Sequence, residues 1–203
     1  MRKLLITVIC ILSITKTLVG QFTQSLSFSG PGQIPSGPTT FTVSVSLTFN
    51  GYNALGLSYW VQVDNALAPF LSLTNVQYFT FPTPNQTTPN PAPFDSTAGS
   101  DAGYMLERRD LGAHFPNLSN MVPPGTYHVT DLTFQLAAGN PGGSHTLRIT
   151  TLFPRVSIVD DDDFNEDPLP AASFTLNIVP EPCTIALLIV AAGFALVVRR
   201  KTS

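Results

Sequence analysis

The stretch Phe41-Thr-Val-Ser-Val-Ser-Leu-Thr-Phe49 alternates apolar and small polar residues throughout its length. Successive side chains of a β-strand point to opposite faces, so this period of two predicts a strand with one buried and one solvated face. The Asn50-Gly51 pair that follows is typical of a turn at the end of such a strand.

Further short strands are expected on both sides of this stretch, separated by turns rich in glycine and proline. Their apolar residues fall within 22–28, 55–63, 70–81, 127–136, 147–153, 156–159 and 174–178. The apolar phase slips at Thr130-Asp131, which indicates a β-bulge. About eight or nine strands and no convincing amphipathic helix predict an all-β antiparallel sandwich.

The segment from Phe81 to Gly103 differs from the rest because it contains five prolines among Thr, Asn and Ser. Proline donates no ladder hydrogen bond, so a central strand is excluded here. We predict a long surface loop, the most mobile part of the domain.

The first twenty residues have the pattern of a secretory signal peptide. Arg2-Lys3 precede an apolar run from Leu4 to Ile14, and uncharged residues lead to a cut expected after Gly20. The signal helix is therefore expected at residues 1–20 and the sandwich at 21–179. The two cysteines, Cys10 and Cys183, both lie outside the sandwich, which consequently has no disulfide and no thiol nucleophile.

The expected sandwich is acidic. Residues 21–179 carry twelve acidic side chains against four arginines, while the other basic residues lie in the terminal segments. Such a surface offers little to neutralise phosphates, so nucleic acid is excluded as a partner.

The C-terminal residues 180–203 form three consecutive parts. Pro180, Glu181 and Pro182 come first, an uncharged apolar run covers 183–198, and the basic cluster Arg199, Arg200 and Lys201 follows. A helix over 183–198 is about 24 Å long, which reaches across a bilayer if the membrane thins and the basic ends snorkel. The basic cluster places that end in the cytoplasm.

This tripartite segment resembles the PEP-CTERM sorting signal of Gram-negative bacteria. The resemblance implies passage through the secretion machinery, an inner-membrane intermediate, and cutting near Pro180-Glu181-Pro182 by an exosortase, a membrane-embedded cysteine-dependent enzyme. It also implies release to the outer surface or to an extracellular polysaccharide matrix. Physical chemistry alone equally allows an uncleaved single-pass anchor.

The region from Thr39 to Phe153 also resembles cohesin-like, Ig-related β-sandwich domains. The resemblance rests on the 41–51 stretch, on Leu57-Ser-Tyr-Trp-Val-Gln-Val-Asp64, and on Pro124-Gly125-Thr126-Tyr127 leading to Asp131-Leu-Thr-Phe134. It implies the fold alone, because no partner-binding residue of a cohesin has a counterpart here.

One dense set of oxygen ligands stands out as a candidate metal loop: Asp160, Asp161, Asp162, Asp163, Asn165, Glu166 and Asp167. Ca²⁺ takes about 6–8 oxygen ligands, and this loop offers several. The spacing is not that of an EF-hand, and adjacent aspartates repel one another, so an exposed mobile loop without metal is the alternative. No other cofactor is indicated.

No catalytic motif is evident, and we expect no enzymatic activity. His114, His128 and His145 lack metal-ligand spacing. Glu107, Asp110 and Asp131 are candidates for a glycosidase pair, whose separation a sequence cannot give. Exposed aromatic residues could stack on sugars, and the candidates are Tyr52, Tyr59, Trp60, Tyr78 and Tyr104.

These observations favour a non-enzymatic β-sandwich protein, exported to the surface or matrix of a Gram-negative bacterium and sorted by its C-terminal signal. The alternatives are a carbohydrate-binding module that binds extracellular polysaccharide, or a membrane-anchored adhesin. A hydrolase comes third.

Overall fold

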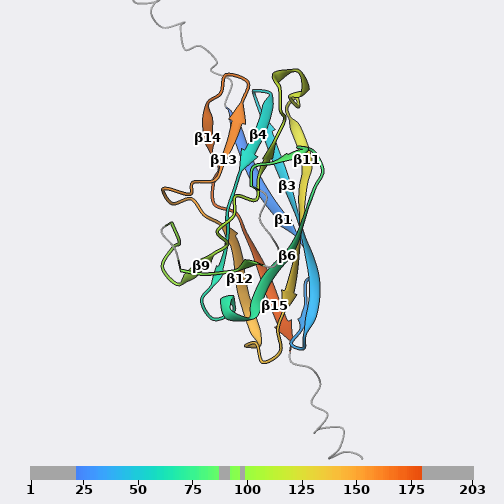
Figure 1. Ribbon diagram of the computed structural model, residues 1–203, viewed down its shortest axis with the longest axis vertical. Helices are drawn as coiled ribbons and strands as arrows, with labels where there is room; N and C mark the ends of the chain where they lie inside the picture. The colour runs from blue at the N-terminus through green and yellow to red at the C-terminus, as the bar shows by residue number, and fades with distance from the viewer. Residues whose placement is uncertain (1–21, 87–91, 97–98, 180–203) are drawn as a thin grey trace, which may run out of the picture.

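The computed structural model describes residues 22–86, 92–96 and 99–179, and the fold and site below concern these residues (Figure 1). Two single-turn 3-10 helices, η1 (Ala68–Phe70) and η2 (Leu118–Asn120), interrupt an otherwise all-β chain. The strands in chain order are β1 (Thr23–Ser29), β2 (Ile34–Pro35), β3 (Thr39–Asn50), β4 (Ala54–Ser58), β5 (Val61–Asp64), β6 (Leu71–Tyr78), β7 (Thr83–Pro84), β8 (Ala92–Pro93), β9 (Tyr104–Leu106), β10 (Ala113–His114), β11 (Gly125–Leu136), β12 (Gly143–Ile149), β13 (Ile158–Asp161), β14 (Glu166–Pro168) and β15 (Ser173–Val179).

The strands form three hydrogen-bonded sheets, with the orders β1-β3-β11-β6-β8, β2-β15-β12-β5-β9 and β14-β13-β4-β10-β7. The first sheet runs along one side of the elongated molecule, and the other two follow one another along the opposite side (Figure 1). One hydrophobic core lies between these layers. The predicted all-β sandwich is confirmed, with more and shorter strands than the eight or nine expected.

Strand β3 shows the predicted alternation. Its five apolar side chains are all buried, and the intervening serines and threonines are half-buried or exposed. Antiparallel pairing with β1 on one side and β11 on the other makes β3 a central strand. The predicted bulge is also present, since the β11–β3 register shifts between His128 and Thr130, next to the expected position.

The prediction of a single strand over residues 55–63 is wrong. The chain instead breaks into β4 and β5, which belong to different sheets. Tyr59 lies at the break, fully buried, and its hydroxyl bonds the Thr130 hydroxyl on the opposite layer. Its backbone N–H donates to Asp110 at 3.1 Å. These contacts fix the point at which the chain passes from one sheet to the other. An alternating pattern alone does not predict that point.

The proline-rich segment is better anchored than predicted. Phe81 and Phe94 are buried in the core, and β7 and β8 are both edge strands, where proline is tolerated. Asn85 donates to the Leu57 carbonyl and to Ser58 and Asp110. The described parts of this segment therefore cover the core and are not a freely exposed loop.

The body of the sandwich continues to Val179. The Val179 carbonyl accepts from the Ser36 backbone at 2.9 Å, and β15 pairs with β2 in parallel over its last residues. Strand β15 ends at one end of the molecule's long axis, and the β13–β14 hairpin lies at the other (Figure 1). The helices expected at 1–20 and 183–198 lie outside the described residues; within these, no helix is long and apolar enough to cross a membrane.

Candidate functional site

The acidic run at 160–167 forms the tip of a β-hairpin. Strand β13 ends at Asp161, β14 begins at Glu166, and Asp160 pairs with Glu166 across the ladder. Phe164 turns the chain with a positive φ of 61°, in the left-handed region. The run is thus the turn of a hairpin, in which residues 163–166 are exposed.

Asp161 organises the turn of this hairpin. Its carboxylate accepts hydrogen bonds from the backbone N–H of Asp163 at 2.9 Å, and from the backbone N–H and side-chain amide of Asn165 at 2.7 and 2.9 Å. Burial alone would raise the pKa of Asp161, but these bonds outweigh it and lower that pKa below its usual value. The residue therefore holds the loop in shape as an ionised side chain.

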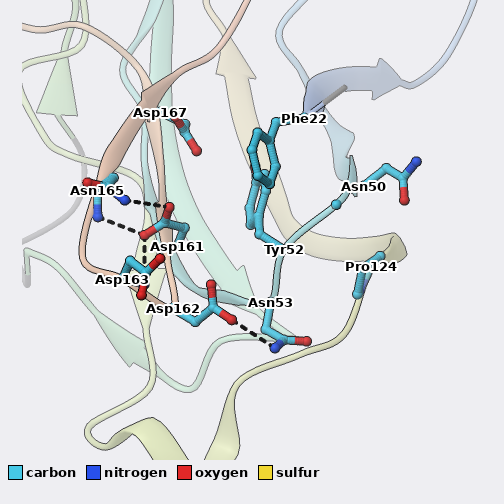
Figure 2. Close-up of a pocket in the computed structure, with 11 residues that line it drawn as sticks. Phe22, Asn50, Tyr52, Asn53, Pro124, Asp161, Asp162, Asp163, Asn165 and Asp167 are labelled. Carbon is cyan, nitrogen blue, oxygen red and sulfur yellow. Dashed lines mark hydrogen bonds between the residues drawn. The ribbon is translucent and has the colours of Figure 1, made fainter. Parts of the chain in front are cut away.

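The hairpin forms one wall of a pocket of about 620 Å³, which we call the acidic pocket (Figure 2). Figure 2 shows Asp161, Asp162, Asp163, Asn165 and Asp167 on one side and the rings of Phe22 and Tyr52 on the other. Asp162 connects the hairpin to the segment after β3, because its carboxylate accepts a hydrogen bond from the Asn53 side-chain amide at 2.9 Å. No basic residue lines this pocket within the described part of the chain.

The aromatic wall follows from the turn after β3. Gly51 has a φ of +93°, and a side chain there would meet the Phe22 ring at 2.9 Å, so glycine is required. This turn seats Tyr52 between two rings, with centroid distances of 5.3 Å to Phe49 and 5.9 Å to Phe22. Phe22 itself remains 56% exposed, so one aromatic face is open to solvent.

Two ionisable side chains of the acidic pocket, Asp167 and Tyr52, have raised pKa values. Burial, then the charge of Asp161, raises the pKa of Asp167. Burial, then the charges of Asp167 and Asp161, raises the pKa of the Tyr52 hydroxyl well above its usual value. That hydroxyl is buried and has no hydrogen-bond partner among the described residues. The pocket therefore carries negative charge that no basic residue of its described lining compensates, and the Tyr52 hydroxyl is buried behind its wall.

The structure brings five of the seven predicted calcium ligands to the pocket, and Asp160 and Glu166 are not part of its lining. Both oxygens of Asp161 are engaged by the loop itself, so a Ca²⁺ ion would have to compete with those donors. Within residues 22–86, 92–96 and 99–179, no three His, Cys, Asp or Glu side chains form a group that could hold a metal. Calcium binding stays a prediction.

The three histidines have separate structural partners. His114 contacts the Asn85 amide oxygen at 2.7 Å, and His128 contacts Asp131 at 2.8 Å while stacking on Phe79. His145 lies against Asp64 at 3.1 Å. They are not brought together.

The carboxylates considered for glycoside hydrolysis are also held by different neighbours. Glu107 forms a buried ion pair with Arg109 at 2.7 Å. Asp110 accepts from the backbone of Tyr59 and Gly112, and Asp131 accepts from the Ser44 hydroxyl at 2.6 Å. Each carboxylate supports the local fold.

The aromatic residues considered for sugar stacking are largely covered. Tyr52 and Tyr59 are buried, and Trp60 and Tyr78 are half-buried. The face of Tyr104 is covered by the Arg148 guanidinium, 3.5 Å from the ring centroid. The sorting residues Pro180, Glu181, Pro182, Arg199, Arg200 and Lys201 lie outside the described residues.

No family model matches the sequence, and no curated protein does. Among solved structures, the cohesin module of a family 33 glycoside hydrolase from Clostridium perfringens matches with a TM-score of 0.51, at 14% identity, over 79% of this chain and 100% of the module. A chain of the complex between a CaDoc0917 variant and CaCohA2, the latter from Clostridium acetobutylicum, matches with a TM-score of 0.50, at 16% identity, over 77% of this chain and 100% of that chain. These matches define a cohesin-like β-sandwich, as the sequence resemblance implied.

The aromatic half of the acidic pocket is not evident from the sequence. The pattern places Phe22 only in a first strand, and Asn53 carries no signal of its own. The Asn50-Gly51 turn is the one available indication, because it brings Tyr52 back toward the end of the sandwich.

Proposed function

We propose that this chain is an exported, non-enzymatic binding protein whose cohesin-like sandwich is delivered by the C-terminal signal at Pro180-Glu181-Pro182. One observation carries the proposal: the folded body is hydrogen-bonded up to Val179, the residue directly before that signal. A cut within the signal by an exosortase would thus release the sandwich with every strand intact. The mature protein would then stay at the outer surface or in an exopolysaccharide matrix of a Gram-negative bacterium.

The fold supports a role in binding. One of the matched structures is a complex between two proteins, so this kind of sandwich serves as a partner-binding body there. In the present chain, the candidate catalytic carboxylates and histidines are engaged in supporting the fold. We therefore favour a role for the sandwich in binding a protein partner over a role in converting a substrate.

Cell fractionation tests the delivery step. Replacing Pro180, Glu181 and Pro182 together with alanine should hold the protein in the inner membrane, because the processing enzyme no longer recognises its signal. The matched control replaces Pro123 and Pro124, two exposed prolines of the body, and should be released like the wild type. Equal fractionation of wild type and signal variant would refute the proposed delivery.

A further inference from the structure

The sheet β1-β3-β11-β6-β8 has an outer face with almost no charge. Its five strands contain no lysine, arginine or glutamate, and Asp131 is their one aspartate. The other eleven acidic residues and all four arginines of residues 22–179 lie outside these strands. Serine and threonine hydroxyls cover most of the outer face of β3 and β11, and Thr48 and Thr126 bond each other across it at 2.9 Å. A neutral ligand that carries hydroxyl groups of its own complements such a surface.

A β-bulge brings two ionisable side chains together on this face. His128 and Asp131 are three residues apart, so in a regular strand their side chains would point to opposite faces. The register shift between His128 and Thr130 puts both on the outer face. There Asp131 lies opposite Ser44 on β3, and its side chain contacts that of His128 at 2.8 Å. Bulges are over-represented next to functional sites, where they re-aim a side chain.

Asp131 is the centre of a group that we call the bulge cluster, formed by Ser44, Gln77, Phe79, His128 and Asp131. The Oδ1 atom of Asp131 accepts from the Ser44 hydroxyl at 2.6 Å and lies 2.8 Å from Nε2 of His128. No hydrogen bond from the described residues ends on its Oδ2 atom, and the side chain is 24% exposed. The exposed Gln77 lies directly opposite on β6. A carboxylate acceptor and an amide donor are therefore open to solvent side by side.

A stacked pair of rings adjoins these polar groups. The Phe79 ring packs on the His128 imidazole, with centroids 4.1 Å apart and planes 24° apart. The backbone fixes this pair: the Phe79 N–H donates to the Val129 carbonyl at 3.1 Å, and the Thr80 hydroxyl donates to the His128 carbonyl at 2.6 Å. Phe79 is nevertheless 43% exposed. An aromatic ring held in this way offers an apolar surface beside hydrogen-bonding groups.

The bulge cluster suits a sugar better than a charged group. A cationic ligand would meet a carboxylate that already has two partners, and an anionic ligand would be repelled by it. A sugar has an apolar C–H face to place on the Phe79 ring, and its hydroxyls both donate and accept. They can donate to Asp131 and accept from Gln77. Ser44, Asp131 and Gln77 lie on three adjacent strands and so span about 10 Å, which gives room for a short run of sugar units.

We propose that the bulge cluster binds a neutral polysaccharide, with Phe79 against a sugar ring and with Asp131 and Gln77 bonded to its hydroxyls. The polysaccharide chain continues over the hydroxyl-rich outer face of β3 and β11. The inference rests on the proposed function in taking the sandwich as an exported binding body, and it names a ligand class for that body. It does not depend on cleavage of the tail.

The test uses the isotope-labelled full chain in a mild detergent without a sugar headgroup, followed by nuclear magnetic resonance. The neutral probes are cellohexaose, laminarihexaose, mannohexaose and xylohexaose, and the charged control probe is oligogalacturonate of the same length. We expect at least one neutral probe to give saturable shifts at Gln77, Phe79, His128 and Asp131. The galacturonate should give none, because its carboxylates would approach Asp131.

Variants of the bulge cluster locate the binding. F79L should weaken it about fivefold, because the ring is lost while an apolar side chain remains, and F79W should restore it. Q77A should weaken it about threefold through the loss of one hydrogen bond. The matched control is Q135A, which removes a second exposed glutamine of the same sheet face, opposite Thr40 and away from the cluster. It should leave the affinity within about twofold.

Gln77 and Gln135 are both exposed, so neither alanine variant should change the melting temperature by more than a degree or two. Shifts that do not saturate with any neutral probe would overturn the proposal. So would saturable shifts confined to another surface, equal binding of the galacturonate, or a loss in Q135A as large as that in Q77A. Retention of the tail in cells would contradict the proposed delivery and leave these results unaffected.

Discussion

Asn165 holds the Asp161 carboxylate with two donors at once, its backbone N–H at 2.7 Å and its side-chain amide at 2.9 Å. A third bond comes from the Asp163 backbone. Three donors on one buried carboxylate explain how four consecutive aspartates are accommodated in a tight turn, and they make Asp161 the residue on which the acidic wall depends.

D161N should destabilise the protein by about 2 kcal/mol at neutral pH, because hydrogen bonds to a charged acceptor are lost. The lowered pKa sets the pH dependence: ionised Asp161 stabilises the fold above its unfolded pKa of about 3.9, and this contribution disappears as pH falls through the folded value. The difference between the variant and the wild type should therefore shrink below about pH 4. Denaturant unfolding at several pH values measures this.

D163N is the control for that experiment. Asp163 is exposed and its side chain accepts no hydrogen bond within the described chain, so the change in stability should stay below about 0.5 kcal/mol. A D163N variant as unstable as D161N would show that charge, and not the hydrogen bonds, holds the turn.

Y52F should stabilise the protein by about 1 kcal/mol, because it removes a buried hydroxyl that has no partner among the described residues while keeping the ring between Phe49 and Phe22. Thermal unfolding of the variant checks this. A lower melting temperature would mean that the hydroxyl contributes to the fold.

R109M should cost about 3 kcal/mol at neutral pH, because it leaves the buried Glu107 carboxylate without its ion-pair partner. Burial already raises the pKa of Glu107, against the opposing hydrogen bond from Arg109. A raised folded pKa means that stability is retained at low pH and lost as pH rises through that value. The loss in R109M should thus be larger at pH 8 than at pH 5.

The double variant E107Q/R109M separates charge from packing at this ion pair. It removes both charges, so its stability should vary less with pH than that of R109M. If R109M loses the same stability at pH 5 and pH 8, the Glu107 charge is not the cause of the loss.

G112A should be severely destabilising, by about 3 kcal/mol or more, because overpacking against rigid backbone cannot relax. An added Cβ would lie 1.9 Å from the Leu57 carbonyl oxygen. Gly32 has nothing within 4 Å, which makes G32A the matched control. Equal denaturation midpoints for the two variants would contradict the close approach of the 110–112 turn to β4.

Local periodicity is sufficient to predict β3 and β15. Their apolar residues alternate because each strand has one buried face, and the structure buries most of those residues. The break between β4 and β5 is not predictable in this way, since it depends on Tyr59 contacting Asp110 and Thr130, residues 51 and 71 positions away. A pattern of alternating residues carries no information about such contacts.

The acidic and aromatic halves of the acidic pocket also differ in how far the sequence predicts them. Its acidic half is a contiguous run that composition reveals, but the place of its hairpin in the fold depends on the long-range pairing of β13 with β4. Its aromatic half is brought to it by folding: Asn53 reaches Asp162 across 109 residues. Long-range pairing of that kind decides where pockets form, and it is encoded in the whole core and not in any one segment.

The proposed mature protein is a sandwich that ends close to Val179 and has lost its tail. Intact mass measurement of the protein recovered from the extracellular fraction tests this most directly. We predict a mass for a chain that begins near Gln21 and ends within residues 179–182. A recovered protein whose mass still includes residues 187–201 would contradict this claim and leave a membrane-tethered sandwich.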